Sequence, residues 1–112
     1  MGKEEDIENL RKHKEALEII VDNPEKFDLK GEGIKQIHVE QPLFDEKNIL
    51  VEPDIVFEYD NGELYIIEYK DNGKHYNMAR RQLTRAAWWY GRYRKDISPR
   101  NIHTRIIQAS DI

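Results

Sequence analysis

Apolar residues recur at helical spacing near both ends of this 112-residue chain. Over residues 4–22 they fall on one side of a helix, at Ile7, Leu10, Leu17, Ile20 and Val21. Pro24 disfavours helical geometry at the preceding residue and predicts the end of this helix. Over residues 77–94 a second apolar face comprises Ala79, Leu83, Ala86, Ala87, Tyr90 and Tyr93. The pattern therefore predicts two amphipathic helices.

Four segments between and after these helices are rich in β-branched and aromatic residues: 34–44, 53–60, 63–70 and 102–109. The expected order is α-β-β-β-α-β. Both faces of the ribbon formed by 53–60 and 63–70 carry apolar side chains, which predicts a sheet covered on both sides. We expect an α/β fold with a mixed sheet flanked by helices, and a single domain over residues 1–112.

The turn sequence Asp60-Asn61-Gly62 leaves two strand registers open. A two-residue turn, the commoner choice for Asn-Gly, would pair Asp60 with Glu63 and put Asp54 and Glu68 on opposite faces. A three-residue turn with Gly62 in the left-handed conformation would place Asp54 directly across from Glu68, with Lys70 on the same face. Two opposed acids repel each other unless a cation lies between them, so the second register predicts a divalent-metal site.

Composition narrows the setting. The chain has no cysteine, which excludes disulfides and thiolate metal sites. It has no long apolar run, and its first residues are charged, so we expect an intracellular, cytoplasmic protein. Residues 1–68 hold 8 Lys and Arg against 19 Asp and Glu, whereas residues 69–112 hold 10 against 3. A basic half on an acidic chain suggests a local site for a polyanion, although charges can also segregate without a function.

Pro53-Asp54 followed by Glu68-Tyr69-Lys70 resembles the signature of the PD-(D/E)XK nuclease superfamily. The segment Gln82-Leu83-Thr84-Arg85 resembles the Q-L-x-R(-Y) element of RecB-like nucleases, although Ala86 stands where that element has its tyrosine. The chain is also similar to the nuclease domain of archaeal branched-DNA and mismatch endonucleases. The resemblance covers nearly the whole chain and implies a restriction-endonuclease-like core.

The resemblance also implies roles for individual residues. Asp54, Glu68 and the Tyr69 carbonyl would hold Mg²⁺ or Mn²⁺, and Lys70 would help to activate the attacking water. Gln82 would support Lys70 or contact the substrate. Such sites also take a ligand from the first helix, for which this chain has two candidates, His13 and Glu18. The structural alternative for His13 is a core histidine, and that for Glu18 is a solvated residue at the edge of the helix.

Four residues of the second helix share one ridge at spacings of four, seven and eleven: Arg81, Arg85, Trp88 and Arg92. With Lys74, they are candidates for binding nucleic acid, because arginines suit phosphates and an aromatic ring suits an exposed base. Two alternatives need no nucleic acid: the arginines can form a solvated basic face, and Trp88 can be a contact in a dimer.

The function expected from these features is a metal-dependent nuclease acting most naturally on DNA that is branched, flapped or single-stranded. One alternative is a non-catalytic nucleic-acid-binding or assembly module on the same fold. The other is an unrelated α/β interaction domain, which would use the two-residue turn and bind no metal. A chain this small is expected to form a homodimer or join a larger assembly to grip a duplex.

Overall fold

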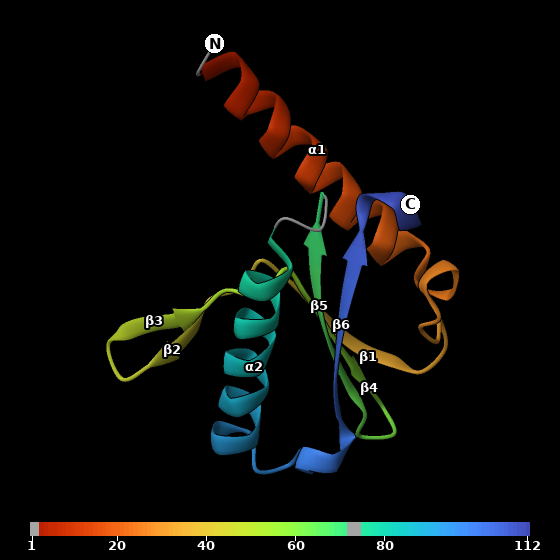
Figure 1. Ribbon diagram of the computed structural model, residues 1–112. Coiled ribbons are helices and arrows are strands. Elements are labelled where there is room, and N and C mark those ends of the chain that lie inside the picture. The colour runs from red at the N-terminus through yellow and green to blue at the C-terminus, as the bar shows by residue number, and fades with distance from the viewer. Residues whose placement is uncertain (1–2, 72–74) are drawn as a thin grey trace.

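The computed structural model describes residues 3–71 and 75–112 as a mixed sheet between two long helices (Figure 1). The four-stranded sheet has the order β1-β4-β5-β6, and a separate two-stranded sheet pairs β2 with β3. The helices are α1 (Lys3–Asp22) and α2 (Tyr76–Tyr93), with short 3₁₀ turns at Pro24–Phe27, Pro99–Asn101 and Ala109–Asp111. The strands are β1 (Ile34–Val39), β2 (Leu43–Asp45), β3 (Asn48–Val51), β4 (Ile55–Tyr59), β5 (Leu64–Lys70) and β6 (Ile102–Gln108).

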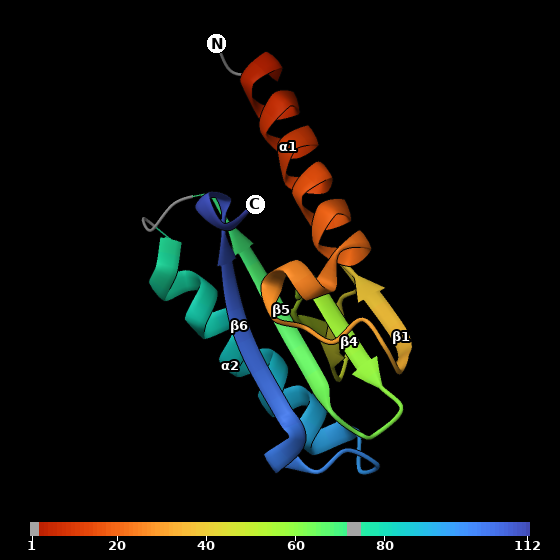
Figure 2. The same cartoon turned by 90° about the vertical axis from the view of Figure 1, so that its right-hand side faces the viewer.

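The main sheet is antiparallel from β1 to β5 and parallel between β5 and β6. Successive side chains on a strand face opposite sides, so each face of the β4–β5 ribbon has its own core. One face packs against α1 and contains Ile55, Phe57 and Ile67. The other packs against α2 and contains Val56 and Ile66. Figure 2 shows the two helices on different sides of the sheet, as the apolar pattern predicted.

The turn between β4 and β5 has three residues. Tyr59 donates its N–H to the carbonyl oxygen of Glu63 at 2.9 Å, and Gly62 takes a φ of 90° that suits glycine. Ile55 pairs with Ile67 and Phe57 with Tyr65. This register is the one that brings Asp54 and Glu68 to the same face, and it is not the register that an Asn-Gly pair most often adopts.

Two strand boundaries differ from the sequence-based expectation. The predicted strand 34–44 is wrong as one element, because the chain turns at Glu40, whose φ is +50°, and Pro42 follows. Leu43 begins the β2–β3 hairpin, of which β3 was not anticipated. The predicted strand 53–60 begins only at Ile55, since Pro53 has no N–H to donate to a ladder.

The apolar stripe of α1 is buried only in its C-terminal half. Leu17 and Ile20 lie in the core, whereas Ile7 and Leu10 are exposed on the part of the helix that extends beyond the sheet (Figures 1 and 2). On α2, Leu83, Ala86 and Tyr90 are buried as expected. Of the helices in the described ranges, none is both long enough and apolar enough to cross a membrane.

Candidate functional site

The carboxylates of Asp54 and Glu68 lie together where β4 begins and β5 ends. The backbone N–H of Asp54 donates to Glu68 Oε2 at 2.8 Å, and the backbone N–H of Tyr69 donates to Asp54 Oδ2 at 2.8 Å. Glu68 is thus held by the backbone N–H of Asp54 itself, and Asp54 by the N–H of the residue that follows Glu68. The chain bends at Asp54, just before β4, and the Asp54 side chain thereby takes the place that a ladder carbonyl would have opposite Tyr69.

The reciprocal bonds engage Glu68 Oε2 and Asp54 Oδ2. The N–H and C=O groups of a strand residue face the same neighbouring strand, and the Tyr69 N–H faces Asp54. The Tyr69 carbonyl is therefore directed to the Asp54 side of β5. Two carboxylates and a carbonyl form a set of hard oxygen donors, the type that Mg²⁺ takes.

Glu68 has the most perturbed carboxyl group in this region. Its side chain is only 2% exposed. Burial, followed by the nearby negative charge of Asp54, raises the pKa of Glu68 to about 7, against the lowering effects of the Asp54 N–H, Lys70 and His13. The raised pKa means that the ionised form of Glu68 lacks sufficient positive charge around it, and a cation bound beside it would stabilise that form.

His13 is the first-helix candidate that reaches the acids. Its Nε2 lies 3.3 Å from Asp54 Oδ1, and its ring meets the Tyr69 ring edge-on with centroids 5.8 Å apart. The hydrogen bond with Asp54 raises the pKa of His13, and the charge of Glu40 acts in the same direction, while burial and Lys70 oppose them. Protonated His13 is therefore a counter-ion for Asp54.

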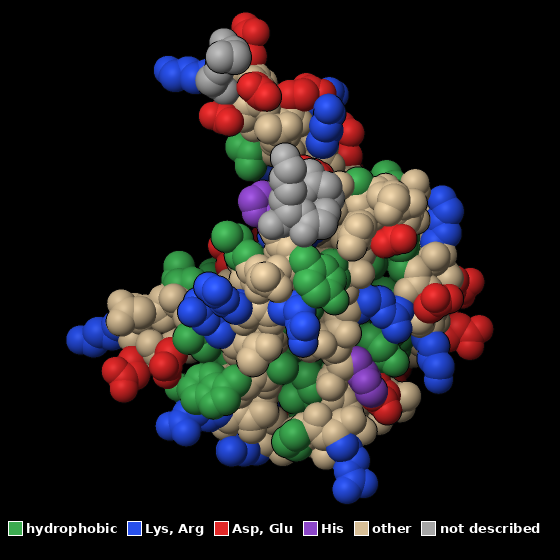
Figure 3. All heavy atoms as spheres, viewed as in Figure 1, with side chains coloured by type: hydrophobic (Ala, Val, Ile, Leu, Met, Phe, Trp, Pro, Cys, Tyr) green, Lys and Arg blue, Asp and Glu red, His purple; other side chains and the backbone are tan. Residues whose placement is uncertain are grey.

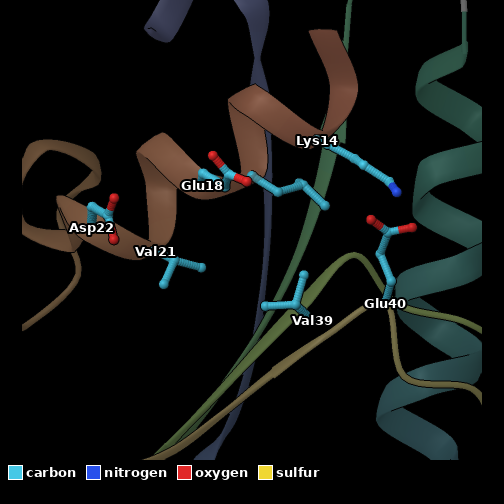
Figure 4. A pocket seen from close by; sticks show the side chains of 7 residues that line it. Lys14, Glu18, Val21, Asp22, Val39 and Glu40 are labelled. Carbon is cyan, nitrogen blue, oxygen red and sulfur yellow. The ribbon is translucent and has the colours of Figure 1, made fainter. Parts of the chain in front are cut away.

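Glu18, the other first-helix candidate, lies elsewhere. It is exposed and lines a pocket of about 250 Å³ between α1 and the end of β1, with Val21 and Val39 (Figure 4). In the same view Lys14 and Glu40 point toward each other. The structure brings His13, and not Glu18, into contact with Asp54.

A separate cleft of about 310 Å³ opens beside the acid pair and is lined by Glu40, Leu50, Val51, Glu52, Asp54, Gln82 and Arg85. Gln82 comes from α2 and lies at the margin of its apolar face, as the sequence predicted. Its Oε1 atom is buried and accepts no hydrogen bond from the described residues. Such an atom is costly to leave unpaired and suits a donor supplied by a ligand or by water.

The donor set matches a magnesium-type site in composition. Among residues 3–71 and 75–112, no group of three or more His, Asp or Glu side chains is arranged to hold a metal ion. Mg²⁺ keeps several waters and is commonly bound through one or two carboxylates together with substrate phosphates. Asp54, Glu68 and the Tyr69 carbonyl are donors of that type, and Gln82, whose buried Oε1 has no partner among the described residues, is one of the residues that line the adjoining cleft.

The basic ridge predicted on α2 is exposed along its whole length, at Arg81, Arg85, Trp88 and Arg92. Arg85 lines the cleft with Asp54, which connects the ridge to the acid pair. Lys70 is partly buried, and its charge acts on both Glu68 and His13. The predicted phosphate contact at Lys74 lies outside the described residues.

Sequence reasoning missed Glu40. This residue lines the cleft, donates its N–H to the Asp54 carbonyl at 2.9 Å, and has a left-handed φ that a non-glycine residue adopts at a cost. Its charge also acts on His13. A signal existed, because β1 ends where β4 begins, so the residue after Val39 lies beside Asp54.

No model of a known protein family matches this chain. Neither a curated protein nor a solved structure matches it significantly. The likeness to the nuclease signature thus rests on the chain's own residues: Asp54, Glu68, Lys70 and Gln82.

Proposed function

We propose that this protein is a metal-dependent nuclease of the PD-(D/E)XK type that hydrolyses phosphodiester bonds, with DNA as the favoured substrate. The observation that carries the proposal is the reciprocal bonding of Asp54 and Glu68, which holds two acids on one face of the β4–β5 ribbon despite their mutual repulsion. An arrangement that raises the pKa of Glu68 to about 7 is unfavourable in itself and is useful when a cation is bound.

Each residue then has a role. Asp54, Glu68 and the Tyr69 carbonyl would hold Mg²⁺ or Mn²⁺, and His13 would orient Asp54. A divalent ion bound there supplies positive charge that stabilises the scissile phosphate in the transition state. Lys70 would orient the attacking water, and Arg85 would hold a substrate phosphate in the cleft.

The reaction is hydrolysis. A bond forms between the water oxygen and phosphorus, and the bond from phosphorus to the leaving sugar oxygen breaks. The water gives up a proton to solvent, and the leaving oxygen gains one. Arg81, about one turn before Arg85 on α2, would contact another phosphate of the nucleic-acid backbone. Such contacts are needed because an acidic site alone would repel its polyanionic substrate.

A cleavage assay tests the proposal. The purified protein is incubated with branched, flapped, single-stranded and fully paired DNA, and with RNA of the same sequences, in Mg²⁺, Mn²⁺ or EDTA. We expect cleavage that requires the metal and is lost in Asp54→Ala and Lys70→Ala. Asp60→Ala and Lys95→Ala make the same charge changes at exposed positions outside the cleft, and both should keep the activity.

The alternatives give different results. Binding of these nucleic acids without cleavage in any metal would support the non-catalytic module on the same fold. Cleavage that persists in Asp54→Ala would contradict the assignment of the site. The absence of both binding and cleavage would leave the unrelated interaction domain, although its expected two-residue turn is not the turn that the chain adopts.

A further inference from the structure

An exposed pair of aromatic rings lies on α2, away from the acid pair. Trp88 is 49% exposed and Tyr93 is 42% exposed. Their rings meet edge to face with centroids 6.3 Å apart. The guanidinium carbon of Arg92 lies 5.6 Å from the centre of each ring. Arg92 therefore places a positive charge over both aromatic surfaces.

Trp89 and Tyr93, the aromatic residues near Trp88, make side-chain hydrogen bonds, whereas Trp88 makes none among residues 3–71 and 75–112. The Nε1–H of Trp89 donates to the Phe44 carbonyl at 2.8 Å, and the Tyr93 hydroxyl donates to Asp45. These two bonds attach the β2–β3 hairpin to α2. The Trp88 indole has neither bond and lies on the exposed ridge. A single exposed apolar ring is common on protein surfaces, so the case for a ligand rests on the Arg92 guanidinium and the Tyr93 ring that lie beside Trp88.

Position and charge point to a nucleic acid. Arg85 lines the cleft with Asp54, and Trp88 follows on the same ridge after a rise of about 4.5 Å along the helix. Between Tyr76 and Tyr93, α2 carries arginines at 80, 81, 85 and 92 and no acidic residue. Figure 3 shows basic and hydrophobic side chains next to each other on the face of the molecule that α2 covers. A strand leaving the cleft along this ridge meets positive charge first and an open ring next.

We propose that Trp88, with Arg92 and Tyr93 beside it, is a stacking site for one unpaired base of the nucleic acid whose backbone enters the cleft. A base must leave its duplex before its face can cover an indole, so the site selects single-stranded or unpaired segments. Every base has such a face, and selection by sequence is therefore not expected. This inference rests on the proposed nuclease function and names the part of the substrate that the enzyme recognises.

Binding measured in EDTA separates this site from catalysis. Trp89→Phe leaves Trp88 as the only tryptophan, and its fluorescence reports stacking directly. Titration with a single-stranded oligodeoxynucleotide should quench that fluorescence, whereas a blunt duplex of the same sequence should not. By anisotropy with a labelled oligonucleotide, Trp88→Ala should weaken single-strand binding about tenfold and Trp88→Phe less, because a phenyl ring still stacks.

Matched controls address charge and surface loss. Arg92→Ala should weaken single-strand binding, and Arg100→Ala, which removes the same charge from an exposed position outside α2, should have a smaller effect. Leu10→Ala removes a more exposed apolar side chain from α1 and should leave binding unchanged.

Three results would overturn the stacking site. They are unchanged single-strand binding in Trp88→Ala, an equal loss for single strand and duplex, and a dimer in the parent that Trp88→Ala converts to a monomer by light scattering. The last would assign the rings to a contact between two copies. Failure of the nuclease proposal looks different: Trp88 is quenched by single strands in EDTA, yet no nucleic acid is cut when metal is added.

Discussion

Two buried glutamates face α2 from the same side of the β4–β5 ribbon, but their carboxylates have different hydrogen-bond and charge partners. Glu58 is 5% exposed and Glu68 is 2% exposed. Glu58 accepts hydrogen bonds from Arg94 at 2.8 Å and from His38 at 2.5 Å. Glu68 accepts a hydrogen bond from the backbone N–H of Asp54, and the Asp54 carboxylate lies beside it.

The pKa values express this difference. Burial acts to raise the pKa of Glu58, but its bonds with Arg94 and His38 outweigh burial and lower it below the ordinary value. For Glu68, burial and Asp54 together raise the pKa to about 7. A buried acid that the fold has already neutralised is part of the structure, whereas one left without a strong cation is a candidate for chemistry. The Arg94–Glu58 pair therefore serves as an internal reference for the site.

The largest contrast is expected in catalysis. Glu68→Gln keeps the shape of the side chain but removes its charge, and we expect it to reduce metal-dependent cleavage by at least ~100-fold, in line with loss of a metal-holding carboxylate. Glu58→Gln should leave cleavage per folded molecule unchanged. Initial rates normalised to the folded fraction measure both. An equal loss of cleavage rate in the two variants would contradict the assignment of a catalytic role to Glu68 alone.

Stability should respond in the reverse order. Arg94→Ala leaves Glu58 buried with only His38, and we expect it to lower the free energy of unfolding at pH 7 by ~3 kcal/mol. Lys70→Ala should change it by less than ~1 kcal/mol, because Lys70 makes no ion pair among the described residues. Urea denaturation gives both values. A larger cost for Lys70→Ala would mean that Glu68 depends on Lys70 as Glu58 depends on Arg94.

The pH dependence of stability isolates Glu68. Because its pKa is raised on folding, the folded state holds the proton more tightly, and stability in EDTA should fall as pH rises from about 4.5 to about 7. The loss is ~3 kcal/mol at most, from the size of the shift. His13, whose pKa is also raised, loses its contribution in the same direction, so the parent must be compared with Glu68→Gln. The difference between their unfolding curves should grow over that range; a constant difference would contradict the raised pKa.

The smallest effect expected is stabilisation by metal. At pH 8, above the raised pKa of Glu68, Mg²⁺ or Mn²⁺ at 100 times its dissociation constant should raise the free energy of unfolding by ~2.7 kcal/mol, and lower concentrations should raise it by less. The increase should vanish in Asp54→Asn and persist in Glu58→Gln. Thermal unfolding with and without EDTA measures it. Stabilisation that survives in Asp54→Asn would place the ion elsewhere.

Much of this fold could be predicted from local patterns. The apolar spacing of α2 and the apolar residues on both faces of β4 and β5 are confirmed, because each pattern reflects burial of one face or of two faces of an element. In the β2–β3 hairpin, β2 was merged with β1 and β3 was missed, because the apolar residues of this hairpin are only partly buried and follow no regular period. Its attachment through Trp89 and Tyr93 depends on residues more than 40 positions away, which no local pattern reveals.

The sequence alone determined which charged residues the candidate site can use, namely Asp54 just before β4 and Glu68 and Lys70 on β5. It left open whether Asp54 and Glu68 lie on the same face, because a turn longer by one residue shifts the register and places every side chain of one strand on the other face relative to its partner. The tertiary structure decided that point through the left-handed Gly62, and it chose His13 over Glu18 and added Glu40. These choices depend on where three strand ends and a helix converge, and that convergence is a property of packing rather than of spacing along the chain.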